Sequence, residues 1–155
     1  MYTISTELVA QLSLAVFLGA AIGLERELAR KTAGLRTYAL VSLGSAIFTI
    51  LSGQIMEVNN FGGVTNFDPA RIAAQIIPGI GFIGAGMIIF SQSKLQGITT
   101  AAGIWVTASI GMAVGFHFYA MAVLATVLVL FIFVFLWLLE ERIVKRFASE
   151  AQSSD

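Results

Sequence analysis

The sequence predicts an all-α membrane protein, a bundle of about five transmembrane helices with the N-terminus outside the cell and the C-terminus in the cytoplasm. Of its 155 residues 57% are hydrophobic and only 12% are charged, which is far from the balance of a soluble domain. The apolar residues are gathered in segments close to the roughly 20 residues that a helix needs to cross a bilayer. These segments lie at about 8–24, 37–56, 72–90, 100–116 and 119–139.

The positive charges predict the orientation, because loops rich in lysine and arginine stay in the cytoplasm. With five spans, the first loop, the third loop and the C-terminal tail share one side of the membrane. All the lysines and arginines except Arg71 lie on that side: Arg26, Arg30, Lys31, Arg36, Lys94, Arg142, Lys145 and Arg146. We expect residues 1–148 to form one transmembrane domain and residues 149–155 a short, disordered cytoplasmic tail.

Small and hydroxyl side chains recur at helical spacing in three segments, and such faces let helices approach one another closely. The hydroxyls serve either as interhelical hydrogen bonds or as the lining of a path. The small faces of the first and fourth segments could also serve self-association. The recurring residues are Gln11, Ala15, Gly19 and Gly23 in the first segment, Ser42, Ser45, Thr49 and Ser52 in the second, and Thr100, Gly103, Thr107 and Gly111 in the fourth.

The fourth and fifth segments are predicted to form a hairpin, because only residues 116–118 separate them. The fourth segment is short and rich in glycine, so it is the least secure of the five as a full span. The fifth is bulky on all sides after Ala125 and is expected at the periphery, facing lipid. His117 in the link is expected to anchor the chain at the membrane interface.

The third segment, Arg71–Phe90, is predicted to be the central helix, with close neighbours on two faces. Pro78 removes a backbone donor and frees the carbonyl of Ala74, so a bend or a local opening of the helix is expected there. Gln75 would be buried and would need a hydrogen-bond partner, while Arg71 either reaches the headgroups or lines an outer vestibule. The packing or hinge positions of the whole chain are Gly19, Gly23, Pro78, Gly79, Gly81, Gly84, Gly86, Gly103 and Gly111.

Several kinds of chemistry are disfavoured by the sequence. The absence of cysteine and the single histidine exclude thiol catalysis and clustered cysteine or histidine metal sites. Residues 79–84 match the dinucleotide pattern G-x-G-x-x-G, but they lie within an apolar span without a preceding strand, which favours helix packing. A net charge of zero gives no argument for nucleic acid. We therefore expect no enzyme, no nucleotide and no nucleic-acid partner, and any metal ligand stays unassigned.

Acidic residues at the cytoplasmic end of the first segment are not needed for orientation. Glu25 and Glu27 could pair with Arg26 and Arg36 in an interfacial network, or they could receive a cation. The sequence leaves both alternatives open.

Five blocks of sequence together resemble the MgtC/SapB family of bacterial inner-membrane proteins. They are GLERE (23–27), AGLRTYALVSLGSAIF (33–48), RIAAQ (71–75), GIGFIGAG (79–86) and GITTAAGIWVTASIG (97–111). The resemblance implies about five membrane helices and a link to growth in low magnesium and to virulence. Virulence-type members continue into a C-terminal ACT-like domain that is not expected here. By position, the resemblance points to Glu25, Arg26, Glu27, Arg36, Arg71, Gln75, Thr99 and Thr100 as functional polar residues.

Two functions follow. The first is a non-enzymatic inner-membrane protein, linked to magnesium or ion homeostasis or stress adaptation, which modulates membrane partners and forms a homo-oligomer in the lipid bilayer. The alternative is a small channel or carrier for magnesium or another cation, with its path along the third helix. A water-filled cavity reaching Gln75 would favour the carrier, and a dry packed core would favour the regulator. No cofactor is expected, with magnesium considered only as a ligand or substrate.

Overall fold

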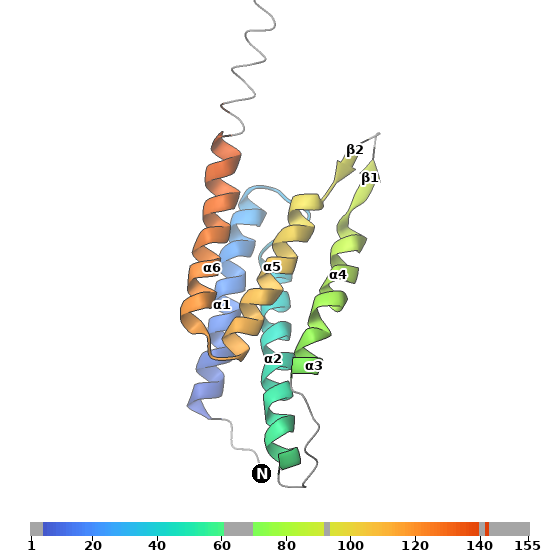
Figure 1. Cartoon of the computed structure of the whole chain (residues 1–155). Coiled ribbons are helices and arrows are strands. Elements are labelled where there is room, and N and C mark those ends of the chain that lie inside the picture. The colour runs from blue at the N-terminus through green and yellow to red at the C-terminus, as the bar shows by residue number, and fades with distance from the viewer. Residues whose placement is uncertain (1–4, 61–69, 92–93, 140–141, 143–155) are drawn as a thin grey trace, which may run out of the picture.

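Four long helices form the bundle in the computed structural model, which describes residues 5–60, 70–91, 94–139 and 142 (Figure 1). Each of the four is long and apolar enough to cross a membrane. They confirm the predicted all-α membrane bundle. The helices are α1 (Thr6–Leu28), α2 (Leu35–Asn60), α5 (Ile98–Gly115) and α6 (Tyr119–Phe131), and α6 continues through the π-helical turn η1 (Ile132–Leu136).

The ends of these helices follow from local sequence. α1 begins after Ser5, whose hydroxyl accepts a hydrogen bond from the Leu8 N–H at 3.1 Å, as a helix N-cap does. α5 and α6 are joined by a tight turn, in which His117 has a positive φ of 64° and the Phe118 N–H donates to the Ala113 carbonyl at 2.8 Å. This turn confirms the predicted hairpin.

The third apolar segment is not one continuous span. It forms α3 (Ala70–Ala74), α4 (Ile76–Met87) and then the antiparallel strands β1 (Ile89–Ser91) and β2 (Lys94–Gln96). The 12 residues of α4 are about 18 Å long, well short of the roughly 30 Å hydrocarbon core. Pro78 has no N–H for the Ala74 carbonyl, and the helix breaks between α3 and α4. The expected local opening is confirmed as an interruption at Gln75, but the single helical span over 72–90 is wrong.

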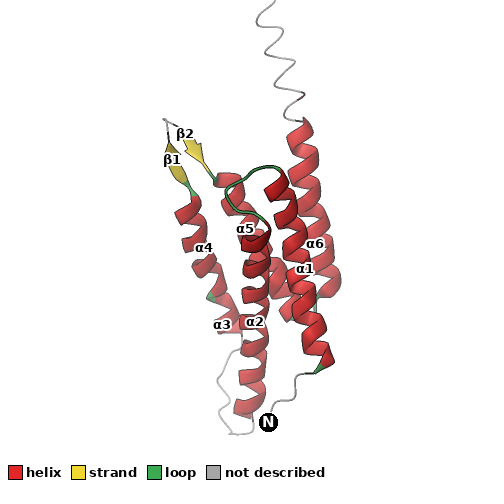
Figure 2. Ribbon diagram, turned by 180° about the vertical axis from the view of Figure 1, so that it is seen from behind, coloured by secondary structure: helices red, strands yellow, loops and turns green. Residues whose placement is uncertain are grey.

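α5, rather than the third segment, is the central helix. It contacts α1, α2, α4 and α6 and buries most of its residues, whereas α4 lies at the edge of the bundle and packs on α5 (Figures 1 and 2). α5 is long and apolar enough to cross a membrane, and with 18 residues it is the shortest of the four, as its short apolar segment suggested. The small residues of α5 let neighbouring helices approach it from several directions. The bulky stripe of α4 does not allow such an approach.

The glycines of α4 do not make the two close contacts that the sequence suggested. A Cβ added at Gly79, Gly81 or Gly86 would meet no atom within 4 Å, and only Gly84 faces a neighbour, with Ala101 Cβ at 3.6 Å. One face of α4 is therefore packed, and its other glycines are uncovered in the described part of the chain.

The small faces of α1 and α5 are used inside the chain. A Cβ added at Gly19 would lie 2.6 Å from the Tyr38 carbonyl oxygen, and one at Gly23 would lie 2.7 Å from the Leu35 Cα. Gly111 meets the Ser42 backbone in the same manner from the side of α5. α2 is thus packed closely between α1 and α5. The small faces of α1 and α5 are therefore occupied by α2 and are not free for the self-association considered above.

The hydroxyl stripe of α2 is buried as predicted, with Ser42, Ser45, Thr49 and Ser52 all at most 3% exposed. The Thr49 hydroxyl, however, donates to the carbonyl of Ser45 in its own helix at 2.8 Å, and Thr107 of α5 does the same with Gly103. Ser42 Oγ is buried and has no partner within the described residues. The hydroxyls of Thr49 and Thr107 are therefore satisfied within their own helices and do not join neighbouring helices.

α6 lies at the periphery, as its bulky sequence predicts. Ala122, Thr126, Val129 and Phe133 are buried against the bundle, and most of its other side chains are exposed. Figure 1 also places the C-terminal ends of α1 and α6 and the β1–β2 strands at one end of the bundle. This arrangement agrees with the shared side required by the topology, and the cytoplasmic assignment of that side stays a prediction.

Candidate functional site

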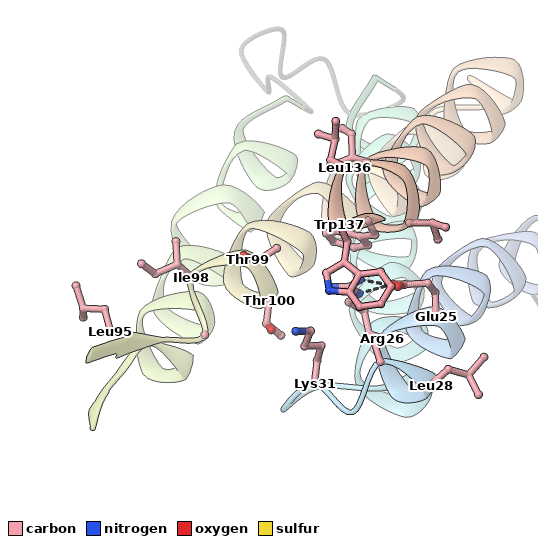
Figure 3. A pocket seen from close by; sticks show the side chains of 15 residues that line it. Glu25, Arg26, Leu28, Lys31, Leu95, Ile98, Thr99, Thr100, Leu136 and Trp137 are labelled. Atoms are coloured by element: carbon pink, nitrogen blue, oxygen red, sulfur yellow. Dashed lines mark hydrogen bonds and ion pairs between the residues drawn. The ribbon is translucent and has the colours of Figure 1, made fainter. Parts of the chain in front are cut away.

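A cleft of about 920 Å³ opens at the end of the bundle where α1 and α6 finish and α5 begins (Figure 3). One wall comes from the last turn of α1, a second from the first turn of α5, and a third from η1 and the residues after it. The polar side chains and the indole that line it are those of Glu25, Arg26, Lys31, Thr99, Thr100 and Trp137.

An ion pair forms the inner wall of this cleft. The Arg26 side chain is only 4% exposed, and its Nη2 donates to Glu25 Oε1 at 2.6 Å while Nε donates to Oε2. The guanidinium also lies 3.7 Å from the centre of the Phe133 ring. A buried guanidinium is costly unless it is paired, and the carboxylate and the ring together satisfy it. Arg26 is therefore held in one position by α1 and α6.

Gly103 of α5 makes room for this arrangement. A Cβ at Gly103 would lie 2.6 Å from the Tyr38 Oη and 2.7 Å from Phe133 Cζ. The fully buried Tyr38 uses that space to donate its hydroxyl to the Thr100 carbonyl at 3.3 Å. The first turn of α5 is thus fixed to α2 on one side, and the Phe133 ring reaches Arg26 on the other.

Glu27 does not join the ion pair and instead caps the start of α2. Its Oε2 accepts a hydrogen bond from the Leu35 N–H at 2.9 Å, which satisfies a free donor at the start of α2. Arg36 is exposed and has no ion pair within the described residues. The expected network thus consists of Glu25 with Arg26, while Glu27 binds backbone. Within the described residues no three metal-ligating side chains are grouped.

Arg71 and Gln75 lie outside the cleft, on α3 and at the start of α4, and both are exposed. The prediction that Gln75 is buried is wrong, because the helix break sets it on the uncovered side of the bundle. The buried amide is Gln11, whose Nε2 donates to the carbonyls of Val114 at 2.7 Å and Gly115 at 3.1 Å. Its place in the four-residue repeat with Ala15 and Gly19 was the signal that could have revealed it.

The structure therefore brings together half of the predicted polar residues and adds others. Glu25, Arg26, Thr99 and Thr100 line the cleft, whereas Glu27, Arg36, Arg71 and Gln75 do not. Lys31, Phe133 and Trp137 join the site, although their sequence context suggested only orientation and lipid contact. Gly103 lies in the small-residue repeat of the fourth segment, which indicated close packing at this position but not that Phe133 is the neighbour. The functional roles of all these residues stay predictions.

A smaller cleft of about 340 Å³ lies at the opposite end of the bundle, lined by residues that include Glu7, Gln11, Thr49 and His117. The Glu7 Oε1 and His117 Nε2 atoms are 3.6 Å apart there, and both side chains are exposed. The two clefts share no lining residue.

Comparison with known proteins gives the family. The sequence model of the MgtC family matches residues 12–142. The chain is 43% identical to "Putative magnesium transporter YhiD" of Escherichia coli K12 over 77% of this chain and 55% of that protein. It is 41% identical to protein SapB of Bacillus subtilis, over 77% and 52% of the two chains, and 43% identical to protein MgtC of Salmonella typhimurium LT2, over 72% and 44%.

The chain spans about half the length of these curated relatives. No solved structure matches it significantly. The family match covers α1 from residue 12 onward, the other three long helices, the helix break and the whole cleft. This chain belongs to the MgtC family.

Proposed function

We propose that the chain is a non-enzymatic regulator in the bacterial inner membrane, which modulates a membrane partner and does not itself conduct ions. The observation that carries this proposal is the packed core between the two end clefts. Along α1, the residues between the clefts include Ala15, Leu18 and Ile22, all at most 5% exposed. Tyr38 of α2 and Ile104 of α5 are fully buried in the same core. A hydrated path would need polar lining where these side chains pack.

The charged groups also favour the regulator over a carrier. A cation path is expected to contain a carboxylate within the span, whereas Glu25 lies in the last turn of α1 and is already occupied by Arg26. Gln75, on which the alternative path depended, lies exposed on the outside of the bundle, and the cleft does not reach it. The carrier along the third helix therefore has less support.

The link to magnesium rests on the relatives. One relative carries the name "Putative magnesium transporter YhiD", and the family model covers most of this chain. We propose that the chain acts in magnesium homeostasis through a partner, because the half-buried carboxylate of Glu25 in the cleft is already neutralised by Arg26.

A homo-oligomer is part of the same proposal, with the uncovered side of α4 as the contact. The break beside Pro78 would leave an unpaired carbonyl and the Gln75 amide facing lipid, where such groups are poorly tolerated. A second copy could cover them, and the bare glycines of α4 would permit a close approach.

The test combines flux with growth. Purified chain in liposomes with entrapped magnesium-sensitive and pH-sensitive dyes should give no saturable flux. The same gene should still alter growth of a host strain in limiting magnesium, and Glu25→Gln should weaken that effect while Arg36→Gln, an exposed control at the same end, should not. Saturable flux that falls in Gln75→Ala would refute the regulator and restore the carrier.

A further inference from the structure

We propose that the cleft at the end of the bundle binds a phosphate group, presented either by an anionic lipid headgroup or by free phosphate. The proposal concerns the ligand of the cleft alone, so it can fail while the regulatory function stands, and the reverse also holds.

The first turn of α5 supplies hydrogen-bond donors to the cleft. The first helical bond of α5 runs from the Ala101 N–H to the Gly97 carbonyl at 2.8 Å, so the N–H groups before it have no partner within the helix. Gly97 is the N-cap, and it has no side chain to cap them. An 18-residue helix also carries partial positive charge at this end, which attracts anions.

A buried, unpartnered hydroxyl gives independent support for a ligand. Thr100 is 4% exposed, yet it lines the cleft, and its hydroxyl makes no hydrogen bond with the described residues. Figure 3 shows the Thr100 hydroxyl turned into the cleft, with the Lys31 ammonium on the same side. The Thr100 oxygen is open to the cleft rather than sealed away from it, so a ligand oxygen beside the ammonium group can accept its hydrogen bond.

The charges in the cleft favour an anion over a cation. Among the described lining residues, Arg26 and Lys31 are positive and Glu25 is negative, and the arginine already binds the carboxylate in two hydrogen bonds. Arg26 Nη1 has no partner within the described residues. A magnesium ion would find no free carboxylate there, whereas a phosphate would find a lysine, a hydroxyl and helix N–H donors.

The position of the cleft admits both sources of phosphate. Its walls carry exposed apolar side chains of Leu95, Ile98, Leu136 and Trp137, which suit the glycerol and upper acyl region of a lipid. It also lies at the end predicted to face the cytoplasm, where the leaflet carries anionic lipids and free phosphate is available.

The cleft contains its own reporter for the test. The sequence has two tryptophans, and Trp137 lines the cleft whereas Trp105 does not. In a Trp105→Phe background, fluorescence of the full chain in neutral lipid nanodiscs therefore reports on the cleft. The probes are inorganic phosphate and short-chain phosphatidic acid, with magnesium chloride as the contrasting ion.

Saturable change with either phosphate probe is expected. Response to the lipid alone assigns the site to a headgroup, and response to inorganic phosphate alone assigns it to the free ion. Lys31→Ala and Thr100→Val should each weaken binding about tenfold, the loss of one good anion contact. The matched controls Arg36→Ala, an exposed cation at the same end, and Thr107→Val, a buried α5 threonine outside the cleft, should bind as the parent does.

The proposal is overturned if neither phosphate probe changes the fluorescence, or if magnesium alone does. Equal weakening in all four variants would also overturn it, because the effect would then come from general charge or stability. Thermal unfolding of each variant in the same nanodiscs separates lost folding from lost binding.

Discussion

Replacing Gly19 by alanine tests the closest contact between α1 and α2. The added Cβ would lie 2.6 Å from the Tyr38 carbonyl oxygen and 2.7 Å from Ser42 Cβ, whereas ordinary contact begins at 3.4 Å. The helices would therefore have to separate by about 0.8 Å, and neither atom can rotate away. Overpacking of this kind costs about 1–3 kcal/mol, and the gain in helix propensity recovers at most about 1 kcal/mol.

The measurement is the SDS fraction that half-unfolds the purified protein in mixed micelles. Gly44→Ala is the matched control, because it adds the same methyl group within α2 where nothing lies within 4 Å. We expect Gly19→Ala to lose about 1–2 kcal/mol and Gly44→Ala to change by less than about 1 kcal/mol in either direction. Ser42→Ala should not rescue Gly19→Ala, since both contacted atoms remain. Equal stability of Gly19→Ala and the parent would refute the backbone contact.

The same assay checks three further variants. Gln11→Leu removes the donor to the Val114 carbonyl and should lower the free energy of unfolding by about 1–3 kcal/mol; an unchanged value would mean that the amide does not join α1 to α5. Glu25→Ala leaves the buried Arg26 unpaired and should cost about 3–5 kcal/mol, against less than about 1 for an exposed pair. Ser42→Ala removes an unpartnered buried hydroxyl, so it should be neutral or stabilising, and a clear loss would reveal a partner.

The four long helices could be predicted because length and hydrophobicity alone decide them. The buried hydroxyl stripe of α2 and the peripheral position of α6 could also be predicted, because the spacing of small and bulky residues along a helix indicates which of its faces are covered by neighbours. The third segment could not be predicted in full, because its composition suits a span. Pro78 predicted the break between α3 and α4. The residue at which α4 ends and the strands begin depends instead on tertiary packing against α5.

Part of the candidate site could likewise be predicted from the sequence, and part could not. Glu25 and Arg26 are adjacent in the sequence, so their pairing was one of the alternatives that the sequence left open. The sequence does not show that Phe133 covers the guanidinium, because an aromatic residue in a bulky span has the same pattern whether it faces lipid or a cation. The amides of Gln11 and Gln75 were likewise indistinguishable by residue type. Only the neighbours of each helix decide which one is buried.

The contact between Arg26 and Phe133 has a consequence for biogenesis. Arg26 lies on α1, whereas the ring that covers it lies on η1, at the end of the last long helix that the structure describes. During synthesis the Arg26 guanidinium is therefore paired only with Glu25, and it lacks its contact with the Phe133 ring until the intervening helices have been made. Insertion of the C-terminal helix then closes the charge into the protein, so a chain interrupted before residue 133 would carry an uncovered cation that quality-control proteases in the membrane could recognise.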